Sequence, residues 1–282
     1  MENALEIEGL NKSFDDFSIS NLSFFLPTGS IMGFIGENGA GKSTTIKLML
    51  GLLKQDSGDI RIFGKNNLSH GIDIKEDVGI VFDECNFPDT LRSCDVPHIM
   101  RHIYANWDDA VFAEYTRKFE LPAKKSFAKY SRGMKMKLVI AVALSHHAKL
   151  LILDEATSGL DPIVRDEILD VFLDFIQDEE HSIFISSHII SDLEKIADYI
   201  TFIHKGKIVF SESKDDLLDT YGILKCSAED FESVPPDAVL GSRRSQFGIE
   251  ALVTRSRVPD GLLVDPASIE EIMLFRVKEA HI

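Results

Sequence analysis

Cysteine is scarce in this chain, and its spacing argues against both a cysteine metal site and a disulfide-stabilised fold. The sequence holds three, Cys85, Cys94 and Cys226. They show neither the paired spacing of a metal-binding site nor a disulfide framework. We therefore expect free thiols in a reducing compartment.

Positive charge is outnumbered. Lys and Arg total 30 against 46 Asp and Glu, a formal net charge of −16. Such a surface repels nucleic-acid phosphates, so a nucleic-acid binder would need a strong local basic patch. The basic stretch between residues 124 and 137 flanks a predicted helix start, where it suits a bound phosphate better. We expect no nucleic-acid partner.

Long apolar runs are also missing. The longest unbroken one is Leu138 to Leu144, and the opening Met1-Glu2-Asn3 lacks the basic and apolar parts of a signal sequence. The sequence therefore predicts no membrane span. Any role at a membrane would depend on a partner.

Strand-like and helical segments alternate, which predicts an α/β core. β-like stretches fill residues 4–26, and a helix is expected at about 42–52. Further strands are expected at 31–35, 59–63, 78–82, 150–153, 182–186, 199–204 and 207–211.

Two segments depart from this alternation. Between residues 87 and 149 helical patterning replaces strands, for instance at 96–104 and 111–119, which indicates an inserted helical subdomain. The chain changes again after Tyr221, with a strand at 248–254 and a last helix whose start, Ser268 to Glu271, has capping-box spacing. We predict a main domain at 1–221 and a small α+β appendage at 222–282.

A phosphate-binding loop is the strongest motif. Residues 36–43 fit G-x-x-x-x-G-K-[ST] between a strand and a helix. Glycines let backbone N–H groups turn toward phosphates, and the helix N-terminus adds partial positive charge. Lys42 would neutralise β/γ-phosphate oxygens, Ser43 would ligate Mg²⁺, and Thr44 would donate a further hydrogen bond. The predicted nucleotide-binding residues of this loop are Gly36, Asn38, Gly39, Ala40, Gly41, Lys42, Ser43 and Thr44.

An apolar strand that ends in two carboxylates supplies a second part of such a site. Asp154 would hold the water shell of Mg²⁺, and Glu155 would orient or deprotonate the attacking water. Because apolar strands ending in an acid are common, this pair gains its meaning from the phosphate-binding loop before it.

Four further motifs follow the order and spacing of one family. Over residues 4–215 the sequence resembles the ABC ATPases. Phe14 stands where that family stacks an aromatic ring on adenine, although it could also be a core aromatic. The other motifs are the signature position (Ser131, Arg132, Gly133, Met134), the D-loop (Ser158, Gly159, Leu160, Asp161) and the switch histidine, His188. Asp161 before Pro162 is also a good helix start.

The resemblance implies a P-loop NTPase core of the ABC type that hydrolyses ATP with Mg²⁺, using Lys42, Glu155 and His188. It also implies a dimer, of identical or different chains, in which Ser131 and the amides of Gly133 and Met134 bind the γ-phosphate held by the opposite chain. Such a dimer would sit under a separate transmembrane permease subunit, at the cytoplasmic face of the cell membrane.

The sequence departs from the family pattern at three positions. Arg132 replaces the first signature glycine, and Met134 replaces its glutamine. Asp83 stands where a glutamine normally senses Mg²⁺ and contacts the membrane partner. As a carboxylate it is a hard Mg²⁺ ligand that also brings negative charge toward the γ-phosphate. It would then alter coupling and slow hydrolysis, or it points to solvent.

Three functions remain open. The first is an ATPase that energises a transporter. The second, a soluble ABC motor on ribosomes or DNA, usually has two cassettes or a long coiled coil, and the acidity of this chain opposes it. The third, a nucleotide-gated module that hardly hydrolyses, is opposed by Glu155 and His188 and left open by Asp83.

Cargo and metal sites are less well marked. The chain is similar to ATPases of Gram-positive exporters of antimicrobial or cytolytic peptides, including phenol-soluble modulin exporters, but no residue here would touch cargo. For His146 and His147 we expect a cationic role at a helix C-terminus rather than metal binding.

Overall fold

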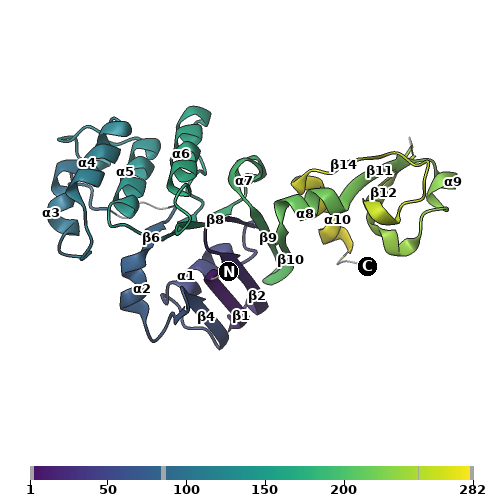
Figure 1. The fold of residues 1–282 in the computed structure, drawn as a ribbon, viewed down its shortest axis with the longest axis horizontal. Coiled ribbons are helices and arrows are strands. Elements are labelled where there is room, and N and C mark those ends of the chain that lie inside the picture. Colours follow the sequence, from purple (N-terminus) through teal and green to yellow (C-terminus); the bar gives the residue numbers. More distant parts are fainter. Residues whose placement is uncertain (1–2, 84–86, 247, 280–282) are drawn as a thin grey trace.

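The computed structural model describes residues 3–83, 87–246 and 248–279. Cys85 lies outside these ranges. The strands form three sheets. In Figure 1 a helical region occupies one end of an elongated molecule and the residues after α8 occupy the other. None of the described helices combines the length and apolar character needed to cross a membrane.

The central sheet has the order β10-β9-β3-β8-β7-β6, parallel except for β10. Three inner strands are buried at every residue, as expected of a parallel sheet covered on both faces. The strands are β3 Ile31–Ile35, β6 Val78–Val81, β7 Leu150–Asp154, β8 Ser182–Ser187, β9 Tyr199–His204 and β10 Lys207–Ser213.

Successive residues of these strands enter two different cores, because side chains alternate across a sheet. Leu151 and Leu153 join the core made with the long helices, whereas Leu150 and Ile152 join the other core. The apolar runs at residues 31–35, 150–153 and 182–186 were thus correctly predicted as strands.

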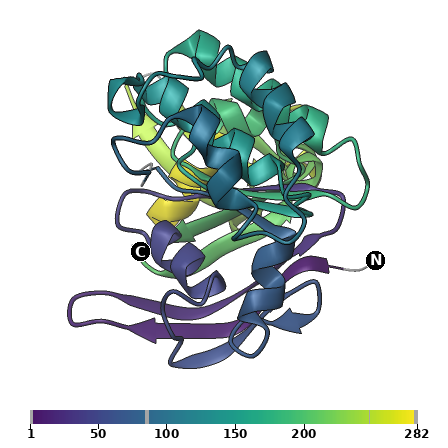
Figure 2. The ribbon, with the colours of Figure 1, turned by 90° about the vertical axis from the view of Figure 1, so that its left-hand side faces the viewer.

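The second core lies under an antiparallel sheet of order β2-β1-β4-β5, drawn in purple and blue at the bottom of Figure 2. Three stacked or tilted rings, Phe24, Phe34 and Phe184, join this sheet to the central one, with centroids 5.2–6.0 Å apart. The elements are β1 Asn3–Ser13, β2 Ser18–Pro27, β4 Ser57–Ile62, β5 Lys65–Asn66, α1 Lys42–Met49 and α2 Gly71–Asp77. Helix α1 ends before the expected Leu52, where Gly51 adopts a positive φ of 66°.

The helical subdomain contains α3 Val96–Met100, α4 Asp109–Lys118 and α5 Arg132–Leu144. Helix α4 begins before the expected residue 111 because the Asp108 carboxylate accepts the Ala110 and Val111 N–H groups. Helix α3 is shorter than expected, since residues 101–103 form a turn. Two more helices, α6 Pro162–Phe175 and α7 Ile190–Ile196, pack on the same face of the central sheet.

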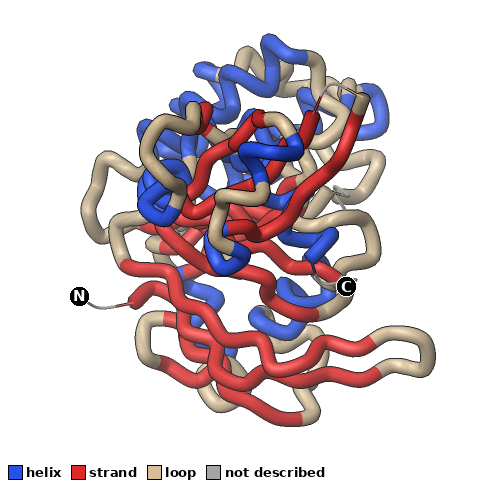
Figure 3. Tube along the Cα trace, turned by 90° about the vertical axis from the view of Figure 1, so that its right-hand side faces the viewer, coloured by secondary structure: helices blue, strands red, loops and turns tan. Residues whose placement is uncertain are grey.

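The C-terminal region forms a third sheet, β12-β13-β11-β14, seen toward the viewer in Figure 3. The predicted capping box is confirmed: the Glu271 carboxylate accepts the Ser268 N–H at 2.9 Å, and the Ser268 hydroxyl accepts the Glu271 N–H at 3.2 Å. The elements are α8 Lys214–Thr220, β11 Tyr221–Cys226, α9 Ala228–Phe231, β12 Val239–Ser245, β13 Gly248–Thr254, β14 Val264–Pro266 and α10 Ile269–Glu279.

His146 corrects one expectation. Helix α5 ends at Leu144, and His146 is fully buried, with its ring stacked on Tyr104 at 4.0 Å between centroids. Its Nδ1 lies 3.2 Å from the Glu76 carbonyl oxygen. Burial is the main cause that lowers the pKa of His146, so the ring is neutral and not a helix-terminal cation. It joins the end of α2 to the helical subdomain.

We expect the neutral His146 ring to make stability depend on pH. Its folded pKa lies below the unfolded value of about 6.5, so its contribution is complete above that value and is lost as pH falls through the folded pKa. Urea unfolding between about pH 7.5 and pH 5 should therefore show a smaller loss of stability for His146→Phe, which keeps a ring but cannot titrate. Exposed His70→Gln is the control. An unchanged pH dependence in His146→Phe would refute this assignment.

Candidate functional site

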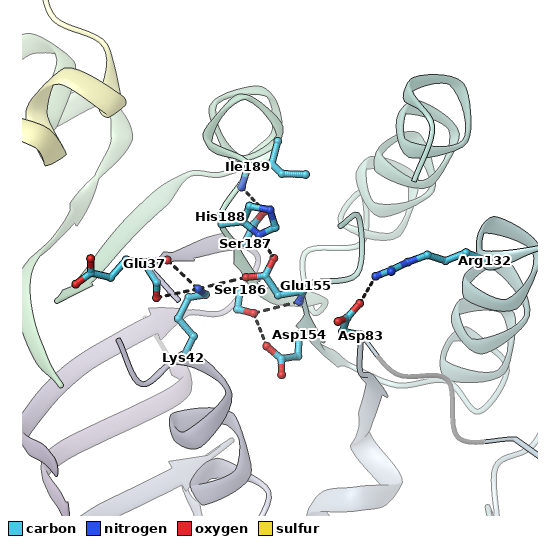
Figure 4. A network of polar contacts seen from close by, with 11 residues as sticks. Glu37, Lys42, Asp83, Arg132, Asp154, Glu155, Ser186, Ser187, His188 and Ile189 are labelled. Carbon is cyan, nitrogen blue, oxygen red and sulfur yellow. Dashed lines mark hydrogen bonds and ion pairs between the residues drawn. The ribbon is translucent and has the colours of Figure 1, made fainter. Parts of the chain in front are cut away.

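The predicted phosphate-binding loop, Asp154, Glu155 and His188 meet at the carboxyl edge of the central parallel sheet, where open α/β sheets bind ligands. The phosphate-binding loop follows β3, Asp154 ends β7, and His188 follows β8. Figure 4 shows the polar network at this edge. A cavity of about 700 Å³ lies there, lined by Asp16, Phe17, Glu37, Asn38, Gly39, Gly41, Lys42, Ser43, Thr44, Asp83, Glu155, Ser158 and His188.

Two glycines shape the loop. A Cβ on Gly36 would lie 2.6 Å from the carbonyl oxygen of Ile203, closer than atoms can approach. Gly41 caps α1 with a φ of 115°, which other residues rarely adopt. The loop therefore closes tightly over β9 and leaves the first turn of α1 open to the cavity.

Lys42 is held by contacts with the phosphate-binding loop and with Glu155. Its Nζ donates to the Gly36 carbonyl at 2.7 Å and lies 3.3 Å from Glu155 Oε1. Only 6% of the side chain is exposed. The ammonium group thus has a carboxylate counterion that a bound phosphate would replace.

Glu155 is fixed from its backbone and its side chain. Its φ of 53° is uncommon for a residue with a Cβ, and such strain is concentrated at functional sites. Its N–H donates to the Ser186 carbonyl at 3.1 Å. Its Oε2 lies 2.6 Å from His188 Nδ1, so Lys42, Glu155 and His188 form one continuous chain of polar contacts (Figure 4).

Ser186 was not predicted from the sequence. It is fully buried, and its hydroxyl donates to Asp154 Oδ1 at 2.6 Å and lies 3.2 Å from the Glu155 N–H. The parallel register pairs Asp154 directly with Ser186. A serine at the end of an otherwise apolar strand was the available signal, but its partner depends on strand order.

Asp154 and Ser43 are two of the residues predicted from the sequence to bind Mg²⁺ together with a nucleotide. Asp154 is nearly buried and oriented by Ser186, while Ser43 lines the cavity. Among the described residues, no three His, Cys, Asp or Glu side chains come together to hold a metal ion. Such a donor set suits Mg²⁺, which keeps waters and phosphate oxygens around one or two carboxylates.

The signature residues lie outside the cavity, at the exposed start of α5. Ser131 is the N-cap of the helix, and its hydroxyl accepts the Met134 N–H at 3.2 Å. This amide, expected to bind an anion, is therefore occupied within the chain. Gly133 packs against Val164 of α6, where a Cβ would lie 3.1 Å from the valine Cγ1.

The predicted D-loop connects Glu155 with α6. Ser158 donates its N–H to the Glu155 carbonyl at 3.0 Å, and Gly159 has a φ of 66°. Leu160 packs against the core between the central sheet and the long helices, which is the main core of the chain. Asp161 caps α6 by accepting the Val164 N–H at 3.1 Å, which confirms the helix-start prediction.

Phe14 is an exposed aromatic, not a core residue. It lies in the turn between β1 and β2 with 44% exposure, and its ring centroid is 6.4 Å from that of Phe17. Phe17 lines the cavity and Phe14 lies beside it. The sequence prediction did not include Phe17.

Asp83 does not simply point to solvent, which was one of its two expected roles. It lines the cavity, and its Oδ1 forms an ion pair with Arg132 Nη2. Two of the three departures from the family pattern are therefore in direct contact (Figure 4).

Comparisons with known proteins agree with this geometry. The family profile described as ABC transporter matches residues 19–158. The bacitracin transport ATP-binding protein of Bacillus licheniformis is 39% identical over 68% of this chain, and the match spans 63% of that protein, slightly under two thirds of its length. The lantibiotic transport ATP-binding protein of Streptococcus pyogenes is 36% identical over 75% of this chain and 91% of its own length.

A solved structure has the same fold. It is a dimeric ATP-binding cassette in a post-hydrolysis state bound to ADP and Pi, with a TM-score of 0.66 and 18% identity, over 74% of this chain and 98% of that one. The predicted fold class, a P-loop α/β core of the ABC type, is confirmed.

The Ser186 contacts generate a prediction. Ser186→Ala removes the hydroxyl that holds Asp154, and loss of such an outer contact typically costs about 10- to 100-fold in metal affinity or activity. We expect the Mg²⁺ concentration that half-saturates ATP turnover to rise, or turnover to fall, by about tenfold.

The matched control is Ser182→Ala at the opposite end of the same strand, where the serine hydroxyl accepts the Gly29 N–H at 3.1 Å. Equal effects of the two substitutions on Mg²⁺-dependent turnover would contradict a specific role of Ser186.

Proposed function

The chain belongs to the ABC transporter family of ATP-binding proteins, and from this premise we propose that it binds and hydrolyses ATP to power a transporter whose membrane-spanning part is a separate subunit. The observation that carries the proposal is the continuous contact between Lys42, Glu155 and His188 beside the glycine loop.

ATP binding begins with an exchange of partners at Lys42. The triphosphate replaces the Glu155 carboxylate as the counterion of the buried ammonium, while loop amides and the start of α1 receive the β- and γ-phosphates. Glu155 is thereby released from Lys42 and keeps its contact with His188. Phe14 and Phe17 offer aromatic faces for the adenine at the mouth of the cavity.

Hydrolysis then depends on where the Glu155 carboxylate is held. Its left-handed backbone and its contact with His188 fix it in the wall of the cavity, where it would orient or deprotonate the attacking water. Ser43 and Asp154 would hold Mg²⁺, which neutralises charge on the transferred phosphate.

The active form is a dimer. Ser131 and the start of α5 are exposed and lie outside the cavity of their own chain, so they are available to a nucleotide bound by a second copy or a related chain. ATP held between the two chains would close the dimer, and hydrolysis would release it. The dimeric cassette with the same fold supports this arrangement.

The names of the relatives support a proposal for the cargo, and the permease partner is part of the same proposal. Two of them are named for bacitracin and lantibiotic transport, which supports export of peptides or other amphipathic substrates. A separate transmembrane permease subunit would supply the path and would hold this chain at the cytoplasmic face of the cell membrane. The helical subdomain is the part expected to dock on it.

Glu155→Gln tests the chemical step. The amide keeps the shape of the side chain but cannot accept the proton of water, so we expect ATP turnover to fall by about 100-fold or more while ATP still binds. Because ATP would persist, size-exclusion chromatography with MgATP should show an accumulated dimer.

The matched control is Glu114→Gln on the exposed surface of α4, which should hydrolyse ATP at the parent rate. Turnover at the parent rate by Glu155→Gln would show that another group activates the water.

The shared site can be tested by mixing two inactive chains. Lys42→Ala damages the phosphate loop, and Ser131→Arg blocks the helix tip. In a mixed dimer one site then holds both defects and the other holds neither. We expect each variant alone to be inactive and an equal mixture to recover at most about a quarter of the parent turnover, since about half of the dimers would be mixed and carry one intact site of two.

A third sample mixes the Lys42→Ala chain with a chain that carries both substitutions and should stay inactive. If the first mixture also stays inactive although both variants dimerise, neither chain completes the site of the other, and the shared-site proposal is wrong.

A further inference from the structure

Arg132 contacts two segments of its own chain that border the nucleotide cavity. Its guanidinium pairs with the Asp83 carboxylate that lines the cavity. It also lies against Gly159, where a Cβ would be 3.0 Å from the arginine Cζ and 3.1 Å from its Nη1. The side chain therefore connects the tip of α5 with the cavity wall and the D-loop.

The cavity has an excess of negative charge. Of the described residues that line it, four carry carboxylates, Asp16, Glu37, Asp83 and Glu155, and one is a lysine. Glu155 contacts Lys42 and His188, and Glu37 contacts His204 Nδ1 at 2.9 Å. Asp83 receives its counter-charge from Arg132, outside the cavity.

The ion pair is too exposed to matter much for folding. The Arg132 and Asp83 side chains are 52% and 46% exposed, and ion pairs of this kind add little to stability. A polyanion bound in the cavity would nevertheless be repelled by the charge of Asp83, because Asp83 forms part of the cavity wall.

We propose that Arg132 is a charge-compensating residue for nucleotide binding within its own chain: it neutralises Asp83, so that a carboxylate can occupy the cavity wall without repelling the triphosphate. This deepens the proposed function and rests on it. The two residues act as one unit, and neither is a free Mg²⁺ ligand or a free phosphate ligand while the pair exists. Arg132 thus acts through Asp83 and not on the reacting atoms.

The pair also explains why the two departures occur together in this chain. Either one alone leaves an uncompensated charge, negative at the cavity wall or positive at the helix tip. Together they leave no net charge at this position of the wall, as an amide would, while Gly159 of the D-loop leaves room for the guanidinium.

A double-substitution experiment tests the proposal. The dissociation constant of MgATP is measured by calorimetry for the parent, Arg132→Gln, Asp83→Asn and the double variant, at about 0.05 M and about 0.5 M salt. Arg132→Gln should weaken binding by about three- to tenfold at low salt, and much less at high salt, because exposed charges are screened.

The partner substitution should rescue this defect. The double variant should bind within about twofold of the parent, and Asp83→Asn at least as tightly as the parent. Arg132→Lys, which keeps the charge, should behave like the parent. In turnover the Arg132→Gln effect should appear in KM, with kcat within about twofold, and the thermal unfolding midpoints should agree across the set.

Each other outcome is decisive. Equal weakening in Arg132→Gln and in the double variant, or weakening that salt does not change, would show that Arg132 acts independently of Asp83 and overturn the proposal. Parent-like binding by Arg132→Gln at low salt would overturn it as well. A parent chain that fails to bind MgATP would refute the proposed function itself, and the pair proposal with it.

Discussion

The parallel pairing of β3, β8 and β7 is the constraint on which the site depends. Hydrogen bonding in this register places Ile35 opposite Ser187 and Asp154 opposite Ser186. Because parallel strands end at the same edge, the phosphate loop, the two carboxylates and the switch histidine reach one place although more than 150 residues separate the first from the last. These strands are buried on both faces by the two cores that they separate.

The chemistry at this edge consists of exchangeable charge contacts on a fixed frame. Lys42, Glu155 and His188 form a chain in which each group has a partner before any nucleotide arrives. A buried ammonium without a counterion would be costly, so the site holds its own substitute for phosphate. In the proposed mechanism ATP displaces this carboxylate, and the displacement leaves Glu155 free to act on water.

Local signals in the sequence were sufficient for most of the frame. Strands β3, β9 and β13 lie at the expected residues, since apolar runs and glycine turns depend on near neighbours. The ends of α1 and α4 were predicted less accurately, because Gly51 ends one helix and Asp108 begins the other by local geometry that periodicity does not report. The α/β class and the ABC type of core were predicted correctly.

Contacts between distant segments could not be predicted in this way. The role of Ser186 follows from strand order, and the stacking of His146 on Tyr104 follows from how the helical subdomain sits on α2. The Asp83 and Arg132 pair joins two residues that are far apart in sequence. Their contact depends on how the start of α5 packs beside the end of β6, which no local pattern reports.

The C-terminal region packs on the main core as well as forming a sheet of its own. One face of its sheet has a small core of its own, but Ile269, Ile272 and Phe275 of α10 belong to the main core, and Glu194 of α7 accepts the Ile269 N–H at 3.2 Å. Helix α7 begins two residues after His188. The region after residue 221 therefore packs against and supports helix α7, which follows His188. A chain cut after residue 221 would expose apolar surface of the main core and would not release an independent module.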